Sequence, residues 1–139
     1  KEEVEEIISF FEETGQAKSR LLIYSCTSGY PVPAEDVALL EINWLYEVYG
    51  DRLSAIGFSG HHLGTSLDVA AYTLGARWIE RHFTKDNTFK GTDHGASLEP
   101  DGLEQLCSQL SSTFSALNYK KSDILPIESV QRQKLKNRK

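Results

Sequence analysis

Two hydrophobic patterns alternate along this chain. Three short apolar runs, at residues 21–26, 53–58 and 77–83, are nearly continuous, which is typical of parallel strands buried on both faces. Around them lie segments with the three-to-four-residue apolar spacing of helices, at residues 4–14, 36–49, 67–74 and 100–117. A glycine follows each of the first three helical segments as an expected C-terminal cap: Gly15, Gly50 and Gly75. The predicted order of elements is therefore α-β-α-β-α-β-α.

Strands that alternate with helices predict an α/β protein with a parallel sheet and right-handed crossovers. Three strands are too few to close a barrel, and the pattern begins with a helix that no strand precedes. We therefore interpret residues 1–118 as the last part of a (β/α)8 TIM barrel, incomplete as given. An open three-layer sheet is the alternative. In the barrel, we expect apolar inner faces that include Leu21, Ile23, Ile56 and Ile79.

Composition narrows the class of protein. The chain has 139 residues, of which 40% are hydrophobic and 25% charged, as expected for one soluble globular domain. Its formal net charge of -5 provides no overall attraction to nucleic acid or to an anionic membrane, and no apolar run is long enough to span a bilayer. No secretory leader is expected, and the two cysteines give neither a disulfide framework nor a zinc spacing, so a reducing, cytoplasmic location is expected. Residues 119–139 are expected to form a polar C-terminal tail, with a solvated basic run at 131–139.

Chemically reactive side chains gather where the apolar runs end, which is where α/β proteins bind their ligands. His61 follows the second run, and His82 lies at the end of the third. Neighbouring strands lie about 4.8 Å apart, so the two imidazoles can reach one ion. Two nitrogen ligands completed by waters suit a borderline divalent ion such as Mn²⁺. The alternative is that each histidine is structural.

Acids and hydroxyls accompany the histidines. Glu80 and Asp93 are candidates for supporting a metal or binding a substrate, and Arg81 is expected to pair with one of them inside the barrel wall. His94 is expected only to cap its loop. The turn with Thr27 and Ser28 could present hydroxyl and backbone N–H groups to an anion, or be a plain βα turn. The glycine-rich segment 57–64 could also hold a phosphate, although it lacks the Gly-Lys-Ser/Thr ending of a P-loop.

Four motifs, taken together, resemble the sialic acid synthase family, the group of N-acetylneuraminate and related nonulosonate synthases. They are Cys-Thr-Ser-Gly-Tyr-Pro at 26–31, Gly-Phe-Ser-Gly-His at 57–61, Ile-Glu-Arg-His-Phe-Thr at 79–84, and Lys-Gly-Thr-Asp-His at 90–94 with Ser-Leu-Glu-Pro at 97–100. The resemblance keeps its order and spacing from about Leu21 to Leu117. It implies a TIM-barrel transferase that condenses phosphoenolpyruvate with an N-acyl-mannosamine-type amino sugar and releases phosphate, for nonulosonate or surface polysaccharide synthesis.

The resemblance also implies roles for individual residues. His61 and His82 match the ligands of a divalent metal, Mn²⁺ or Mg²⁺, and with Glu80 and Asp93 they form the expected catalytic set. Ser59 and Ser28 match positions that bind phosphoenolpyruvate, whereas Tyr30, Glu80 and Asp93 match positions that face the amino sugar. Gly60 and His62 depart from the aspartate and threonine that are common in the family, and these departures bear on which sugar is used.

The rest of the family's catalytic machinery is expected outside this chain. The resemblance implies five earlier strands with further phosphoenolpyruvate-binding groups, and a homodimer of the full-length protein. In many members an antifreeze-like domain also follows the barrel. By itself the chain is therefore expected to be inactive and to associate. Two other functions remain open: a catalytically silent fragment that acts only in assembly, and a different phosphoenolpyruvate-dependent synthase that makes deoxy-sugar acids.

Overall fold

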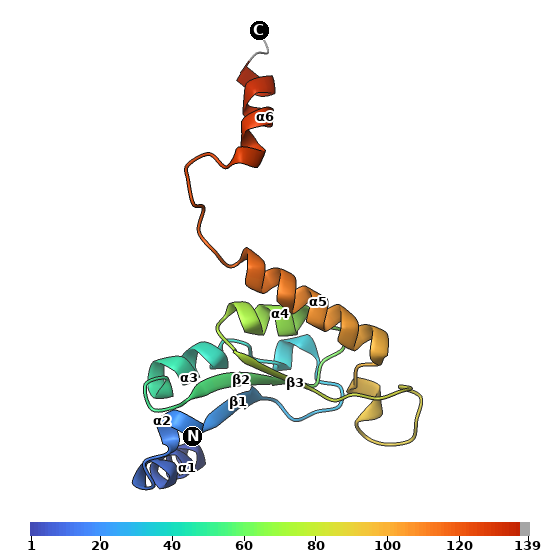
Figure 1. Cartoon of the computed structure of the whole chain (residues 1–139). Helices are drawn as coiled ribbons and strands as arrows, with labels where there is room; N and C mark the ends of the chain where they lie inside the picture. The colour runs from blue at the N-terminus through green and yellow to red at the C-terminus, as the bar shows by residue number, and fades with distance from the viewer. Residues whose placement is uncertain (137–139) are drawn as a thin grey trace.

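The structure is a computed structural model that describes residues 1–136, so the last three residues of the basic run at 131–139 lie outside the described residues. Three parallel strands form one sheet in the order β1-β2-β3 (Figure 1). The strands are β1 (Leu22–Cys26), β2 (Ala55–Gly60) and β3 (Trp78–Arg81). Residue pairing aligns Ile23 with Ile56 and Ser59 with Glu80. The predicted parallel sheet and its chain order are confirmed.

Helices connect the strands and pack on one another. They are α1 (Glu2–Glu13), α2 (Ala17–Arg20), α3 (Glu41–Tyr49), α4 (Ser66–Thr73), α5 (Pro100–Ala116) and α6 (Pro126–Lys136), with short 3-10 turns η1 (Ala34–Asp36) and η2 (His94–Ala96). α3 contacts β1 and β2, α4 contacts β2 and β3, and α5 packs on α4. Side chains from α1, α3, α4, the strands and the turns between them form one hydrophobic core, in which a fully buried Phe or Ile contributes about 1.5–3 kcal/mol.

The prediction that the apolar strand residues face the inside of a barrel, away from the helices, is wrong. Ile56 is completely buried in the core beneath the helices, and Leu21, Ile23 and Ile79 pack against that same core. Alternate strand residues point to opposite faces, so the face away from these helices carries Tyr24, Trp78, Ser59 and Glu80. Trp78 is 57% exposed there. The open three-layer alternative would require a second layer of helices on this face. Within residues 1–136 no such layer is present.

Several element boundaries also differ from the prediction. The helix expected at 36–49 begins at Glu41, because Ala38 adopts a left-handed backbone with φ of 52° between η1 and α3. The second strand begins at Ala55 rather than at residue 53. Leu53, 2% exposed, fills the core from the turn before the strand, which the N–H of Ser54 fixes by donating to the carbonyl of Leu21. An apolar side chain can thus enter the core without belonging to a strand.

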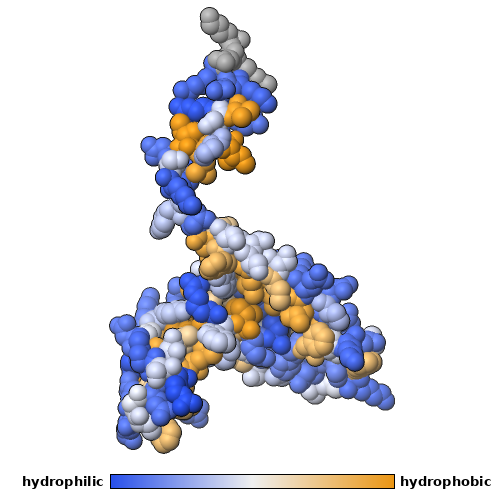
Figure 2. Space-filling view, in the orientation of Figure 1, coloured by the Kyte–Doolittle hydropathy of each residue, from blue (hydrophilic) through white to orange (hydrophobic). Residues whose placement is uncertain are grey.

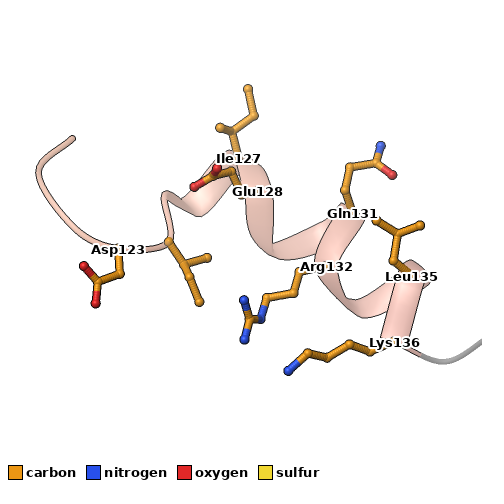
Figure 3. A pocket seen from close by; sticks show the side chains of 8 residues that line it. Asp123, Ile127, Glu128, Gln131, Arg132, Leu135 and Lys136 are labelled. Atoms are coloured by element: carbon orange, nitrogen blue, oxygen red, sulfur yellow. The ribbon is translucent and has the colours of Figure 1, made fainter. Parts of the chain in front are cut away.

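Helix α6 was not predicted, since its segment reads as a polar tail. Pro126 occupies the first helical position, where its missing N–H costs nothing. Glu128 accepts a hydrogen bond from the backbone N–H of Leu125 at 2.6 Å, as in half of a capping box. The helix extends away from the sheet, and Figure 2 shows apolar side chains on it and along α5. A shallow groove follows its surface (Figure 3), with this lining: Asp123, Ile124, Ile127, Glu128, Gln131, Arg132, Leu135 and Lys136.

Candidate functional site

Strand alternation brings the predicted site residues to one face at the carboxyl end of the sheet. Ser59 lies on β2 and His61 just after its end, two residues later; Glu80 lies on β3 and His82 just after its end, with the same spacing. Ser59 and Glu80 are paired in the sheet register, and the Ser59 hydroxyl donates a short hydrogen bond to Oε2 of Glu80. The two histidines therefore follow a matched pair of strand residues.

The imidazoles of His61 and His82 meet at the strand ends. Their ring centroids are 4.9 Å apart, with an interplanar angle of 84°. The ring of Tyr30 contacts both, with centroids 4.7 Å from His61 and 5.5 Å from His82. The structure thus brings together three predicted residues from three different segments.

His61 is oriented from behind by the first turn. Its Nδ1 lies 3.1 Å from the carbonyl oxygen of Thr27, and because a carbonyl can only accept, Nδ1 carries the proton. In the neutral tautomer that carries this proton, Nε2 has the lone pair, which is the arrangement that ligating histidines commonly have. The sulfur of Cys26 lies 3.9 Å from the same Nδ1. The backbone N–H of Val32 donates to the carbonyl of His61 at 2.9 Å and ties the turn that carries Tyr30 to β2.

His82 lies between two carboxylates. Its Nε2 is 3.9 Å from Oε1 of Glu80, and its Nδ1 is 3.6 Å from Oδ2 of Asp93. The three side chains are 29%, 41% and 50% exposed, respectively, so this part of the site is open to solvent. Ser28 is also exposed and lies two residues after the end of β1.

The loop that carries Asp93 is held by internal hydrogen bonds. The Thr84 hydroxyl and Nδ1 of His94 are 2.8 Å apart, and the hydroxyl of Ser97 donates to the carbonyl of Asp93 at 2.8 Å. The hydroxyl and N–H of Thr88, with the field of His94, hold the pKa of the Asp86 carboxyl below its usual range. His94 therefore anchors the loop, as predicted.

The donor set fits a divalent ion held by two imidazoles. The contact of Nδ1 of His61 with a carbonyl leaves Nε2 as the nitrogen that could bind an ion, and Glu80 and Asp93 place carboxyl groups beside His82. Within residues 1–136 no cluster of three or more His, Cys, Asp or Glu side chains is arranged to hold an ion. An ion here would complete its coordination with water or substrate oxygens. Metal binding stays a prediction.

Arg81 does not pair with Glu80 or Asp93, so that prediction is wrong. Its side chain points to the helix side, is 3% exposed, and donates to Oδ2 of Asp68 at 2.6 Å. Asp68, from α4, was missed by the sequence analysis. The sequence feature that could have revealed it is an acid between Leu67 and Val69, in a helix that packs on the sheet. A charged side chain buried there requires a partner of opposite charge.

Gly60 and His62 also lie on the helix side. A Cβ at Gly60 would lie 2.8 Å from Cε1 of Phe58 and 3.0 Å from Oδ1 of Asp68. His62 is 2% exposed, with Nε2 3.4 Å from Oδ2 of Asp68. Both departures from the family pattern therefore lie where residues pack behind the site, and their effect on the choice of sugar stays a prediction.

Fold and site together define an α/β protein with a strand-end site built from imidazoles, carboxylates, hydroxyls and an aromatic ring. The profile of the NeuB family matches residues 1–122, and the chain belongs to this family. Within residues 1–136 no helix is both long and apolar enough to cross a membrane.

Known relatives are synthases of sialic and related acids. The chain is 43% identical to human N-acetylneuraminate-9-phosphate synthase over 110 residues, which cover 79% of this chain and 30% of that protein. It is 36% identical to the N,N'-diacetyllegionaminic acid synthase of Campylobacter jejuni over 115 residues, 83% of this chain and 34% of that one. The chain thus spans about a third of the length of these relatives.

Solved structures show the same arrangement of helices and strands. The N-acetylneuraminic acid synthetase of Leptospira borgpetersenii, solved in complex with citrate, superposes with a TM-score of 0.76 at 29% identity. The match covers 99% of this chain and 47% of that one. The α/β fold with a three-stranded parallel sheet is therefore similar to part of a sialic acid synthase.

Proposed function

We propose that this chain forms part of a nonulosonic acid synthase that condenses phosphoenolpyruvate with an N-acyl amino sugar, with release of phosphate. The observation that carries the proposal is the His61–His82 pair at adjacent strand ends, covered by Tyr30 and flanked by Glu80 and Asp93. Family membership and the relatives that make sialic and legionaminic acids support it. The sheet would be the last three strands of a TIM barrel, in a cytoplasmic homodimer.

In the proposed reaction, C3 of phosphoenolpyruvate forms a bond to the C1 aldehyde of the open-chain sugar, and the aldehyde oxygen becomes a hydroxyl. Water then adds to the cationic C2 centre, and phosphate leaves with its bridging oxygen. A divalent ion on His61 and His82, Mn²⁺ or Mg²⁺, would supply Lewis-acid polarisation of the aldehyde oxygen.

The other roles belong to side chains of this chain. The hydroxyls of Ser28 and Ser59 would bind phosphoenolpyruvate, and Ser59 would exchange its present bond to Glu80 for one to the substrate. Glu80, Asp93 and the ring of Tyr30 would hold the amino sugar beside the imidazoles. The carboxylates of Glu80 and Asp93 lie 3.9 and 3.6 Å from nitrogens of His82, beyond direct hydrogen-bond distance, and would act on the imidazole through their charge.

The ion-ligand assignment is tested with His82→Ala in the intact protein. We expect turnover to fall by orders of magnitude and Mn²⁺ affinity to fall with it, because one of two protein ligands is lost. Cys107→Ser on α5 is the control, since that thiol is exposed and far along the chain from the site. Unchanged turnover and metal content would favour the assembly-only fragment and remove the assignment.

The bond-breaking step is tested separately with ¹⁸O in the bridging oxygen of phosphoenolpyruvate. We expect the label in the released phosphate, and label in the sugar acid would contradict C–O cleavage. A screen of N-acyl amino sugars against phosphorylated aldoses distinguishes this activity from that of another deoxy-sugar-acid synthase.

A further inference from the structure

The guanidinium of Arg81 connects three segments behind the site. Nη1 donates to Oδ2 of Asp68 at 2.6 Å and to the carbonyl of Gly64 at 2.7 Å. Nη2 donates to the carbonyl of His62 at 2.7 Å and to that of Ala96 at 3.3 Å. One buried side chain thus holds the turn after β2, the first turns of α4 and the loop after β3.

Both histidines of the site are covalent neighbours of this cluster. His61 precedes His62, whose carbonyl Arg81 binds, and His82 directly follows Arg81. Since successive residues of an extended chain point to opposite faces, the cluster holds the backbone from the helix side while the imidazoles face the site. We propose that Arg81 is a positioning residue that sets the spacing and ring orientation of His61 and His82. This inference rests on the proposed function.

Stability alone does not account for such a cluster. Its charged groups are almost completely buried, and Nε of Arg81, Oδ1 of Asp68 and Nδ1 of His62 find no hydrogen-bond partner within residues 1–136. Replacing a buried ion pair by apolar side chains of similar volume is often neutral or stabilising. Apolar side chains cannot donate the hydrogen bonds that Arg81 makes to the carbonyls of His62, Gly64 and Ala96. These bonds fix the turn after β2 relative to the loop after β3. Lysine cannot reproduce them either, because its single ammonium lacks the planar fork.

Two variants separate positioning from stability. Arg81→Lys keeps the charge beside Asp68, and the double variant Arg81→Met with Asp68→Leu removes the buried charges. The control is Arg77→Lys, an exposed arginine just before the same strand. Three properties of the intact protein are measured. They are the melting temperature, the Mn²⁺ dissociation constant by electron paramagnetic resonance, and the NMR signals of the histidine ring ¹⁵N atoms in metal-free protein.

We expect both variants to melt cooperatively, to bind Mn²⁺ about tenfold or more weakly, and to show displaced ring signals for His61 and His82. Arg77→Lys should change none of these. Wild-type ring signals and Mn²⁺ affinity in either folded variant would overturn the proposal, even if the melting temperature falls. If wild-type protein binds no Mn²⁺, the proposed metal site fails, and the ring signals alone decide the role of Arg81.

Discussion

At the scale of single residues, close contacts on the open face of the sheet leave little room for a side chain at Gly57. An added Cβ there would lie 2.6 Å from Cε1 of Tyr24 and 2.8 Å from the carbonyl oxygen of Trp78. The tyrosine ring could turn away, but the β3 backbone could not move without disturbing its pairing with β2. The absence of a side chain at Gly57 therefore lets the Tyr24 ring and the β3 backbone pack closely against β2. This contact lies two residues before Ser59 of the site.

We accordingly predict that Gly57→Ala lowers the free energy of unfolding by about 1–3 kcal/mol, the usual cost of overpacking. Thermal or urea unfolding measures the effect. Gly95→Ala is the matched control, because nothing lies within 4 Å of a Cβ at that position, and it should leave stability nearly unchanged. Equal stabilities of the two variants would contradict the packing argument.

A second residue-scale prediction concerns Gly60, where the family resemblance favours an aspartate. Gly60→Asp would place a carboxylate on the helix side, beside the buried carboxylate of Asp68. Two buried like charges are unfavourable, so this substitution should destabilise the protein by several kcal/mol at neutral pH. Gly60→Ala adds only the Cβ and should cost less. A stable Gly60→Asp protein with an unchanged Asp68–Arg81 contact would contradict this account.

At the scale of elements, α1 is held to the turn before β2 by one arginine. Arg52 lies 2.8 Å from carboxylate oxygens of both Glu5 and Glu12, while Ile8 of the same helix enters the core. Hydrogen bonds from Arg52 hold the pKa of the Glu5 and Glu12 carboxyls below the ordinary value of 4.5. Both groups are therefore charged partners at neutral pH.

The lowered pKa sets the sign of a pH prediction. Stabilisation by the two carboxylates is complete above 4.5 and is lost as the pH falls through their lowered pKa values in the folded state. Arg52→Ala should consequently destabilise the protein modestly at neutral pH, since exposed pairs contribute little. The difference from wild type should shrink as the pH is lowered below 4.5 and the carboxyls become protonated. Melting curves at neutral pH and at a series of acidic pH values test this, with Arg20→Ala as an exposed control, and a difference that grows on acidification would contradict it.

At the scale of the whole molecule, the sheet has two edges and one open face. β1 and β3 each pair on one side only within residues 1–136, and Tyr24 and Trp78 are exposed on the face away from α3 and α4. Unpaired strand edges and apolar surface favour association with another chain. In the proposed barrel, further strands would pair with these edges. Those strands would also supply the other contacts to the phosphate of phosphoenolpyruvate.

We therefore predict that the 139-residue chain by itself shows no synthase activity and associates in solution. Light scattering after size exclusion measures the mass, and phosphate release from phosphoenolpyruvate with N-acetylmannosamine measures turnover. A monomer of 15.6 kDa that melts cooperatively and turns over both substrates would contradict the prediction.

Local sequence pattern was sufficient for the order of the three strands and of α1, α3, α4 and α5, and for the residues that meet at the site, but it missed the short helix α2. The periods of strands and helices are set by backbone geometry, and strand ends in a parallel sheet share one edge, so His61, His82, Glu80 and Asp93 could be grouped without a structure. Tyr30 and Ser59 were found through the family resemblance. Helix α6 was missed because the charged composition of its segment is also typical of a solvated tail. The helix-start residues Pro126 and Glu128 were therefore not considered.

Other features depend on contacts between distant segments. When a strand is apolar on both faces, its sequence does not show which face the helices will cover, and Ile56 was placed on the wrong side for this reason. The partner of Arg81 was misplaced too, because Asp68 lies 13 residues earlier and reaches it only when α4 packs on the sheet. Burial of a charge and the choice of its partner follow from packing between elements, which no single segment of sequence contains.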